Sequence, residues 1–422
     1  MKKYTELSAG ELQIEKELVL RQYNEFKAKN LSLDMSRGKP CAEQLDLVSP
    51  MLDAVSSDLP LITQDGIDIR NYGVLDGLPE AKRLFAELLE VRPEQVIVGG
   101  NSSLALIYDA VSRAMQFGTT DRQPPWNKLD RVKFLCPSPG YDRHFTICEF
   151  FGIEMITISM NENGPDMDTV ERLVSSDPAV KGIWCIPKYS NPTGITYSDD
   201  VVRRFAALRP AAEDFRIFWD NAYCVHDLDR PATLLNLMDE CIKQGNEDMP
   251  FIFASTSKIT FSGAGLGLMA ASDNNLERIR RQYSVQTIGF NKLNHLMHTR
   301  YLKNLDGIKQ LMQGHKKILA PKFRAVLDRL DRELAPLGIA EYTRPGGGYF
   351  ISLNTHPGCA KRTVELCKEA GVTLTPAGAA FPYGNDPSDS NIRLAPTYPP
   401  INELESAMEL FCICVRLATI VS

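Results

Sequence analysis

The stretch Phe253-Ala254-Ser255-Thr256-Ser257-Lys258 places a lysine directly after a short apolar run and three hydroxyl side chains. An apolar run of this length that ends in polar residues is typical of a buried strand reaching the edge of a sheet. A similar run at residues 215–219 ends in Asp220, and another at residues 182–186 is followed by Asn191-Pro192-Thr193-Gly194. An amide, a carboxylate and an amine are therefore expected just beyond the ends of three strands.

Apolar runs recur through the middle of the chain, and helical or loop segments separate most of them. The runs cover residues 95–98, 132–136, 154–158, 182–186, 215–220, 251–255 and 267–271. This alternation predicts an α/β fold in which a mostly parallel, seven-stranded sheet carries helices on both faces. Ligands of such sheets bind beyond the carboxyl ends of the strands, where Asn191, Asp220 and Lys258 are expected to lie.

The two ends of the chain have a different pattern from the middle. Residues 10–30 have the spacing of an amphipathic helix, and residues 308–337 predict one long helix despite Pro321. The remaining C-terminal segments suggest a smaller α+β domain. We expect a large domain at residues 50–310 and a small domain that combines residues 1–49 and 311–422.

The composition is that of a globular enzyme, since 44% of the 422 residues are hydrophobic and 24% are charged. The net charge of −6 offers no electrostatic basis for binding nucleic acid or an anionic membrane. The first residues lack the apolar core of a signal peptide, and the ten cysteines and six histidines show no metal-binding spacing. We therefore expect a cytoplasmic protein with reduced thiols, no metal, and neither nucleic acid nor membrane as a partner.

The strand-end side chains fit a single kind of chemistry. The amine of Lys258 could bond to an aldehyde, while the carboxylate of Asp220 could pair with a protonated pyridine nitrogen. Asn191 and Tyr223 could hydrogen-bond an oxygen on the same ring. Taken singly, each has a simpler interpretation: a surface lysine, a helix cap, a turn asparagine or a core tyrosine. Together they indicate an aldehyde cofactor with a pyridine ring.

An anion site is expected beside that ring. Gly100-Asn101-Ser102-Ser103 lies at a strand-to-helix junction, where backbone N–H groups and the helix N-terminus favour a phosphate dianion. Ser255 and Ser257 could add hydroxyl donors. A simple helix cap explains the first motif equally well when it is taken alone.

Three further side chains are candidates for contact with the ring or the substrate. Tyr141 could stack on the pyridine face, and His144 could then reach Asp220 from behind and fix its orientation. Arg393, in Asn391-Ile392-Arg393-Leu394-Ala395, is a candidate for bidentate binding of a carboxylate.

With these motifs the chain resembles the fold-type I, pyridoxal-phosphate-dependent aminotransferases of class I/II, essentially from end to end. It is most similar to a divergent, MocR-like branch of bacterial aspartate aminotransferases. The finer match rests on three phrases: Arg37-Gly38-Lys39-Pro40, Gln286-Thr287-Ile288-Gly289 and Ser255-Thr256-Ser257-Lys258-Ile259-Thr260-Phe261. The resemblance implies pyridoxal 5'-phosphate as cofactor, ping-pong transfer from L-aspartate to 2-oxoglutarate, and a homodimer with shared active sites.

The resemblance also implies a role for each matching residue. Lys258 would form the Schiff base and move the proton, Asp220 would pair with the pyridine nitrogen, and Tyr141 would stack on the ring. The remaining cofactor contacts would come from Gly100, Asn101, Ser102, Ser103, His144, Asn191, Tyr223, Ser255, Ser257 and the neighbouring subunit's Tyr72. The substrate contacts would come from Arg37, Gly38, Asn191 and Arg393.

Two departures from the family pattern concern charge. Leu266 stands where ordinary class I enzymes carry the arginine that binds the cofactor phosphate. The arginine that clamps the distal carboxylate of aspartate is not identified by a motif either. Arg37, Arg143 and Arg300 are the candidates for that clamp.

Three alternatives remain beside aspartate transamination. The scaffold could use another amino acid, or it could catalyse β-elimination or decarboxylation. A non-catalytic ligand-sensing module is disfavoured, because such regulators need an N-terminal DNA-binding domain. The segment before Leu31 is short and acidic for such a domain.

Overall fold

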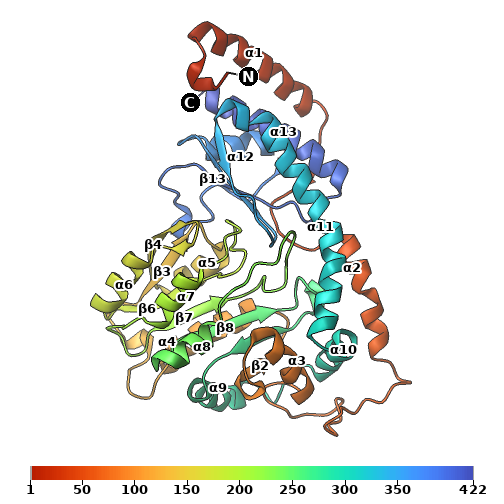
Figure 1. The fold of residues 1–422 in the computed structure, drawn as a ribbon, viewed down its shortest axis with the longest axis vertical. Helices are drawn as coiled ribbons and strands as arrows, with labels where there is room; N and C mark the ends of the chain where they lie inside the picture. The colour runs from red at the N-terminus through yellow and green to blue at the C-terminus, as the bar shows by residue number, and fades with distance from the viewer. Residues whose placement is uncertain (1, 422) are drawn as a thin grey trace.

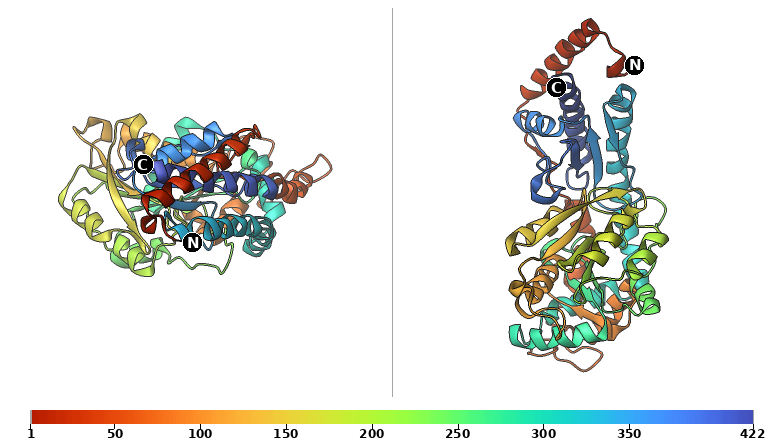
Figure 2. Two further views of the ribbon diagram at one scale, coloured as in Figure 1. Left: turned by 90° about the horizontal axis from the view of Figure 1, so that it is seen from above. Right: turned by 90° about the vertical axis from the view of Figure 1, so that its left-hand side faces the viewer.

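The computed structural model describes residues 2–421 and shows an elongated molecule with two parts stacked along its longest axis (Figure 1). The lower part holds a large sheet between helices, and the upper part holds a small sheet beneath the N-terminal and C-terminal helices. Both chain ends lie at the far end of the upper part, away from the large sheet (Figure 2). The long helix α11 (Leu305–Glu333) runs from one part into the other.

The large sheet has eight strands in the order β2-β9-β8-β7-β6-β3-β4-β5. The bounds in that order are Val96–Val98, Gly267–Ala270, Pro250–Ser255, Arg216–Asp220, Val180–Cys185, Lys133–Ser138, Glu154–Asn161 and Gly164–Pro165. Strands β8, β7, β6, β3 and β4 pair in parallel, whereas β9 is antiparallel to both β8 and β2. The predicted α/β fold with seven mostly parallel strands is confirmed. The eighth strand, β5, is a two-residue strand antiparallel to β4.

Helices cover both faces of this sheet because alternate strand residues point to opposite sides. Trp184 of β6 and Phe218 of β7 belong to the core beneath α4, α5 and α9, while Ile183 and Ile217 belong to the core on the other face. The helices of the first face are α4 (Ser103–Phe117), α5 (Asp142–Phe151) and α9 (Asp273–Gln286). Those of the second face are α3 (Pro79–Leu89), α6 (Met167–Ser176), α7 (Asp199–Ala206), α8 (Leu237–Gln244) and α10 (Lys292–Leu302).

The upper part is built on an antiparallel sheet in the order β10-β11-β13, with bounds Ala340–Tyr342, Ile351–Thr355 and Asn391–Leu394. A short parallel pair joins β1 (Leu33–Asp34) to β12 (Val372–Thr373), which ties the N-terminal segment to this part. Helix α13 (Ile401–Val421) contacts α1 (Ala9–Lys27), α11 and α12 (Ala360–Glu369). The helices predicted at residues 10–30 and 308–337 are present, and Pro321 lies inside α11.

The remaining helices are short. They are α2 (Ala42–Val48) and the 3₁₀ turns Tyr4–Glu6, Ser49–Ala54, Pro93–Gln95, Trp126–Lys128, Ser262–Ala264, Ala335–Leu337 and Pro382–Gly384. In residues 2–421 no helix is long and apolar enough to cross a membrane, and no cluster of three metal-ligating side chains occurs.

The predicted domain boundary at residues 310/311 falls within α11. Ile308 and Met312 pack in a core of the large sheet, while Leu319 and Phe323, further along the helix, pack in the core of the upper part. The division into residues 50–310 and residues 1–49 with 311–422 stays a prediction.

A buried ion pair lies at the amino end of the large sheet. Lys181 Nζ on β6 is 2.5 Å from Asp214 Oδ1, and the indole Nε1 of Trp126 donates to Asp214 Oδ2 at 2.8 Å. All three side chains are buried. Removing one partner of such a pair leaves the other charge without compensation in the core.

Asp214→Ala should therefore lower the free energy of unfolding by about 3 kcal/mol, because Lys181 and the Trp126 indole both lose their acceptor. Urea unfolding followed by circular dichroism measures the change. Glu213→Ala is the matched control, since the neighbouring Glu213 is exposed, and it should change stability little. If both substitutions lowered the free energy of unfolding equally, the proposed contribution of the buried pair to stability would be wrong.

Candidate active site

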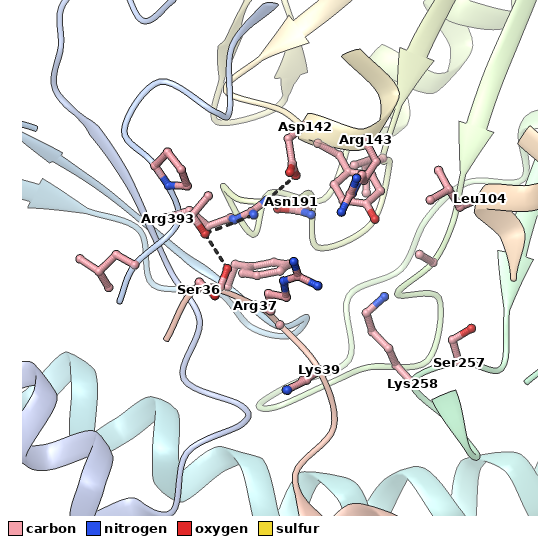
Figure 3. A pocket seen from close by; sticks show the side chains of 18 of the residues that line it. Ser36, Arg37, Lys39, Leu104, Asp142, Arg143, Asn191, Ser257, Lys258 and Arg393 are labelled. Carbon is pink, nitrogen blue, oxygen red and sulfur yellow. Dashed lines mark hydrogen bonds and ion pairs between the residues drawn. The ribbon is translucent and has the colours of Figure 1, made fainter. Parts of the chain in front are cut away.

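A cavity of about 830 Å³ opens at the carboxyl edge of the large sheet (Figure 3). Its walls come from both parts of the molecule, because α12 and Arg393 of β13 face the ends of β6, β7 and β8 across it. Parallel strands bring these ends to one edge, as expected for an open α/β sheet. The cavity is where a ligand would contact both parts at once.

Most of the side chains that the sequence predicts for a site lie on the wall of this cavity. These are Arg37, Gly38, Ser102, Ser103, Tyr141, Asn191, Asp220, Tyr223, Ser255, Ser257, Lys258 and Arg393. Four others do not line it. Gly100 and Asn101 precede the start of α4, His144 lies behind Asp220, and Tyr72 is a distant, exposed residue.

Lys258 follows β8 and lies across the cavity from Arg393 (Figure 3). Its Nζ is 5.0 Å from the ring centre of Tyr223 and 5.8 Å from that of Tyr349. Burial lowers the pKa of Lys258, and the nearby Asp220 carboxylate opposes this shift. A lowered pKa increases the fraction of free amine, which is the form that acts as nucleophile or base.

Asp220, the last residue of β7, is buried and has one oxygen engaged. His144 Nε2 lies 3.1 Å from Asp220 Oδ2, and the imidazole stacks on Trp184 with ring centres 4.6 Å apart. Among residues 2–421, Asp220 Oδ1 is buried and has no hydrogen-bond partner. A buried carboxylate oxygen without a donor is unfavourable, so this atom fits a ligand that brings a cationic N–H. The protonated nitrogen of a pyridine ring meets that requirement.

Asn191 and Tyr223 flank Asp220 as potential donors. The side-chain oxygen of Asn191 accepts from Arg393 Nη1 at 3.2 Å, which turns its amide N–H groups to other partners. Burial raises the pKa of Tyr223 well above its ordinary value and that of Tyr141 to about 12. Both phenols therefore stay protonated at neutral pH and able to donate.

The expected anion cradle is only partly available. Ser102 caps α4, since its hydroxyl accepts from the backbone N–H of Ala105 at 3.3 Å. Both oxygens of Asn101 are used in contacts within the protein. The side-chain oxygen accepts from Gly265 N at 2.7 Å, and the backbone carbonyl accepts from Ser257 Oγ at 3.3 Å. An anion here would meet the N-terminus of α4 and serine hydroxyls.

Leu266 adds no charge to this end of the cavity. Its side chain is buried in the core, and its backbone N–H donates to Thr256 Oγ1 at 2.9 Å. His298, which contacts the same Thr256 oxygen, is held neutral because burial lowers its pKa to about 4.

The cavity wall carries more positive than negative side chains. The basic residues are Arg37, Lys39, Arg143, Lys258, Lys368 and Arg393, and the acidic ones are Asp142, Asp220 and Glu365. An anionic ligand is therefore favoured. Arg300, the third candidate for a distal carboxylate, lies outside the wall, and its guanidinium donates to the carbonyls of Ala54 and Pro60.

His226 is a site residue that sequence reasoning missed. Its Nε2 lies 3.3 Å from the backbone oxygen of Lys258 and must donate to it, because a carbonyl only accepts. The ring packs edge-on against Tyr223 and Tyr349, with centres 5.5 and 5.7 Å away. His226 follows Tyr223 closely in the chain, but its contact with the backbone of Lys258 arises only from tertiary packing.

The pKa of His226 predicts a specific pH dependence. Burial, followed by the charge of Lys258, lowers the pKa of His226 from 6.5 to about 3. His226 therefore becomes protonated near pH 6.5 in the unfolded chain, but only near pH 3 in the folded protein. The stability linked to the neutral ring is complete above pH 6.5 and declines as the pH falls toward 3.

His226→Asn should remove this decline. Below pH 6 the free energy of unfolding of the variant should fall less steeply with pH than that of the wild type, and the two slopes should differ by up to about 1.4 kcal/mol per pH unit. Urea unfolding of both proteins between pH 7.5 and about pH 4.5 measures the slopes. Parallel curves over this range would show that His226 is not held neutral.

Asp142, Thr375 and Phe350 were also not predicted, although all three line the cavity. Thr375 Oγ1 accepts from Arg393 Nη2 at 3.3 Å, and the Arg393 guanidinium lies 4.9 Å from the ring centre of Phe350. Asp142 forms an ion pair with Arg393 at 3.0 Å. Asp142 directly follows the predicted Tyr141 in the chain, and this adjacency was the available signal for it.

Comparisons with known proteins agree with this geometry. Residues 7–422 match the family model described as aspartate amino-transferase. An aspartate aminotransferase of Corynebacterium glutamicum is 47% identical over 401 residues, which cover 95% of this chain and 92% of the relative. The crystal structure of an aspartate transaminase from the same species has a TM-score of 0.95 at 46% identity and covers 98% of both chains. An α-aminoadipate aminotransferase of Thermus thermophilus, solved with N-(5'-phosphopyridoxyl)-L-leucine, shares the fold at 18% identity with a TM-score of 0.73, covering 96% of both chains.

Proposed function

The chain belongs to the aspartate amino-transferase family, and from this premise we propose that it transfers the amino group of L-aspartate to 2-oxoglutarate by a ping-pong mechanism, with pyridoxal 5'-phosphate as cofactor. The observation that carries the proposal is the buried Oδ1 of Asp220, which has no hydrogen-bond partner among the described residues, on the wall of the cavity that also holds Lys258. A cationic wall that favours dicarboxylates supports the choice of aspartate.

When bound, pyridoxal phosphate supplies an aldehyde that condenses with amines and a protonated ring that accepts the electron pair of a carbanion. Asp220 Oδ1 would accept from the ring nitrogen, and Asn191 and Tyr223 would donate to the ring oxygen. Tyr141 would cover the ring face. The phosphate would meet the start of α4, where the donors are Gly100, Ser102, Ser103, Ser255 and Ser257.

The protein's own groups account for the proton transfer. Lys258, with its lowered pKa, is the base that removes the proton from the substrate Cα and the acid that returns it. His144 holds the Asp220 carboxylate from behind, so that its free oxygen keeps a fixed direction. Arg393, with Gly38 on the same wall, would bind the α-carboxylate, and Arg37 is a candidate for the distal carboxylate.

Three finer assignments belong to the same proposal. The phrases around Arg37, Lys258 and Gln286 support membership of the MocR-like branch. A cytoplasmic location is supported by buried cysteines such as Cys136, Cys185 and Cys241, which are thiols in the structure. The further proposal of a homodimer that shares its active sites through Tyr72 rests on exposed apolar surface.

The surface in question is formed by two neighbouring segments. Gly289 packs against the carbonyl of Gly73, so the loop that carries Tyr72 lies beside the one that carries Ile288. Tyr72 is 83% exposed and Ile288 is 63% exposed. Large apolar side chains that gather in the open favour a protein partner, and a second copy of the chain would cover them.

The first test follows the visible spectrum of the holoenzyme. L-Aspartate should convert the bound cofactor to its amine form, and 2-oxoglutarate should reverse the change. Borohydride reduction followed by peptide mass analysis should find the cofactor on Lys258. Lys258→Ala should abolish turnover and this covalent attachment, while the variant keeps its fold by circular dichroism.

The outcomes separate the alternatives. A spectrum that responds to another amino acid but ignores aspartate would change the substrate. Release of ammonia or carbon dioxide without need for an oxo acid would indicate elimination or decarboxylation. Full turnover in Lys258→Ala would sink the proposal.

The second test concerns the distal carboxylate. Arg37 and Arg143 face the cavity, and within residues 2–421 neither guanidinium forms an ion pair. Arg37→Gln or Arg143→Gln should lower kcat/KM for aspartate relative to alanine by about tenfold to a hundredfold, the range for a lost charged hydrogen bond. Arg300→Gln is the control and should leave this ratio unchanged. If neither cavity variant alters the ratio, the distal carboxylate binds elsewhere.

A further inference from the structure

Arg393, the proposed α-carboxylate site, already holds a carboxylate of the protein. Asp142, in the first turn of α5, places Oδ1 3.0 Å from Arg393 Nη1, and the contact is drawn as a dashed line in Figure 3. The Arg393 side chain is 8% exposed, whereas that of Asp142 is 32% exposed. One partner is therefore fixed in the wall, and the other borders solvent.

The donors of Arg393 show why this contact matters. Nη1 donates to Asp142 and to Asn191, and Nη2 donates to Thr375. In the part of the chain that is described, Nε has no partner and is closed off from solvent. A carboxylate arriving from the cavity can therefore bind in bidentate fashion only through Nη1 and Nη2. Both partners of Nη1, Asp142 and Asn191, compete with such a carboxylate for its N–H groups, and of these two Asp142 is the one that borders solvent.

We propose that Asp142 is an internal competitor of the substrate, whose carboxylate occupies Arg393 in the free enzyme and is displaced by the α-carboxylate of the incoming amino or oxo acid. The inference rests on the proposed function, because it takes Arg393 as the α-carboxylate site. Under this proposal Asp142 sets the affinity for the substrate carboxylate without contacting the reacting atoms.

Displacement of Asp142 is structurally feasible. Its side chain borders solvent, so a released carboxylate regains hydration. It also sits on the first turn of a helix, where the positive end of the helix dipole favours a negative charge. The buried guanidinium of Arg393, in contrast, needs an anion at all times, since an unpaired buried charge is strongly unfavourable. Asp142 therefore fills the site between turnovers.

The competition predicts a uniform effect on ligands. An enzyme whose binding-competent state is only fractionally populated shows an affinity reduced by that fraction. Because every amino and oxo acid substrate carries the α-carboxylate, Asp142 weakens all of them by the same factor. Arg37 and Arg143, in contrast, discriminate between aspartate and alanine.

The test uses the full-length holoenzyme and succinate, which carries carboxylates but no amino group. Asp142→Asn keeps the shape of the side chain and removes its charge, so the Kd of succinate by calorimetry should fall about three- to tenfold. The KM values of aspartate, alanine and 2-oxoglutarate should fall by a similar factor. Asp142→Ser, a smaller replacement, should repeat the result, and melting temperatures verify folding of both.

Two controls make the result specific. Glu365→Gln removes another carboxylate of the cavity wall, one that pairs with Arg362 and not with Arg393, and it should leave the Kd of succinate unchanged. Arg393→Gln should weaken succinate at least tenfold. If Arg393→Gln binds succinate like the wild type, the proposed carboxylate site itself fails.

If Arg393→Gln loses binding while both Asp142 variants bind succinate no tighter than the wild type, the competitor proposal is overturned and Asp142 only orients the arginine. An equal gain in Glu365→Gln would overturn it as well, because the effect would then be general cavity electrostatics.

Discussion

The site depends on one buried carboxylate. Asp220 stands at the end of β7, with β6 and β8 on either side, and it is buried with a single oxygen satisfied. Such a group opposes folding unless the surrounding structure holds it. His144, stacked on Trp184, contacts one oxygen, and among the described residues the other oxygen has no hydrogen-bond partner. A locally unfavourable group within a well-packed sheet is the usual mark of a functional position.

The parallel sheet brings further polar side chains to the same edge as Asp220, and the upper sheet supplies the opposite side of the cavity. Lys258 follows the neighbouring strand β8, and Asn191 follows β6, so both lie beside Asp220 although they are distant in the chain. Arg393, on a strand of the upper sheet, closes the cavity from the opposite side and reaches Asn191 through a hydrogen bond. In the proposed function the same asparagine would link the ring contact to the substrate contact and so couple the positions of the two ligands.

The sequence predicts what depends on local pattern. Runs such as residues 251–255 and 215–220 are long and apolar enough to be identified as strands, and the side chains at their ends then follow from the general rule for parallel sheets. The two residues of β5 carry no periodicity, so that strand could not be predicted. His226, Tyr349 and Thr375 act through tertiary contacts with Lys258 or Arg393, which no spacing reveals. The side chain of Asn101 holds the backbone of Gly265, a contact between distant segments that no spacing reveals.

Leu266 adds no charge to its end of the cavity. Its side chain lies in the core, while its backbone N–H is held by Thr256 and the adjacent Gly265 N–H by Asn101. His298, which shares Thr256, is kept neutral by burial and supplies no substitute charge. An anion at this end of the cavity would meet serine hydroxyls and the N-terminus of α4. Arg393, at the opposite side of the cavity, is the positive group at which the proposed substrate carboxylate would replace Asp142.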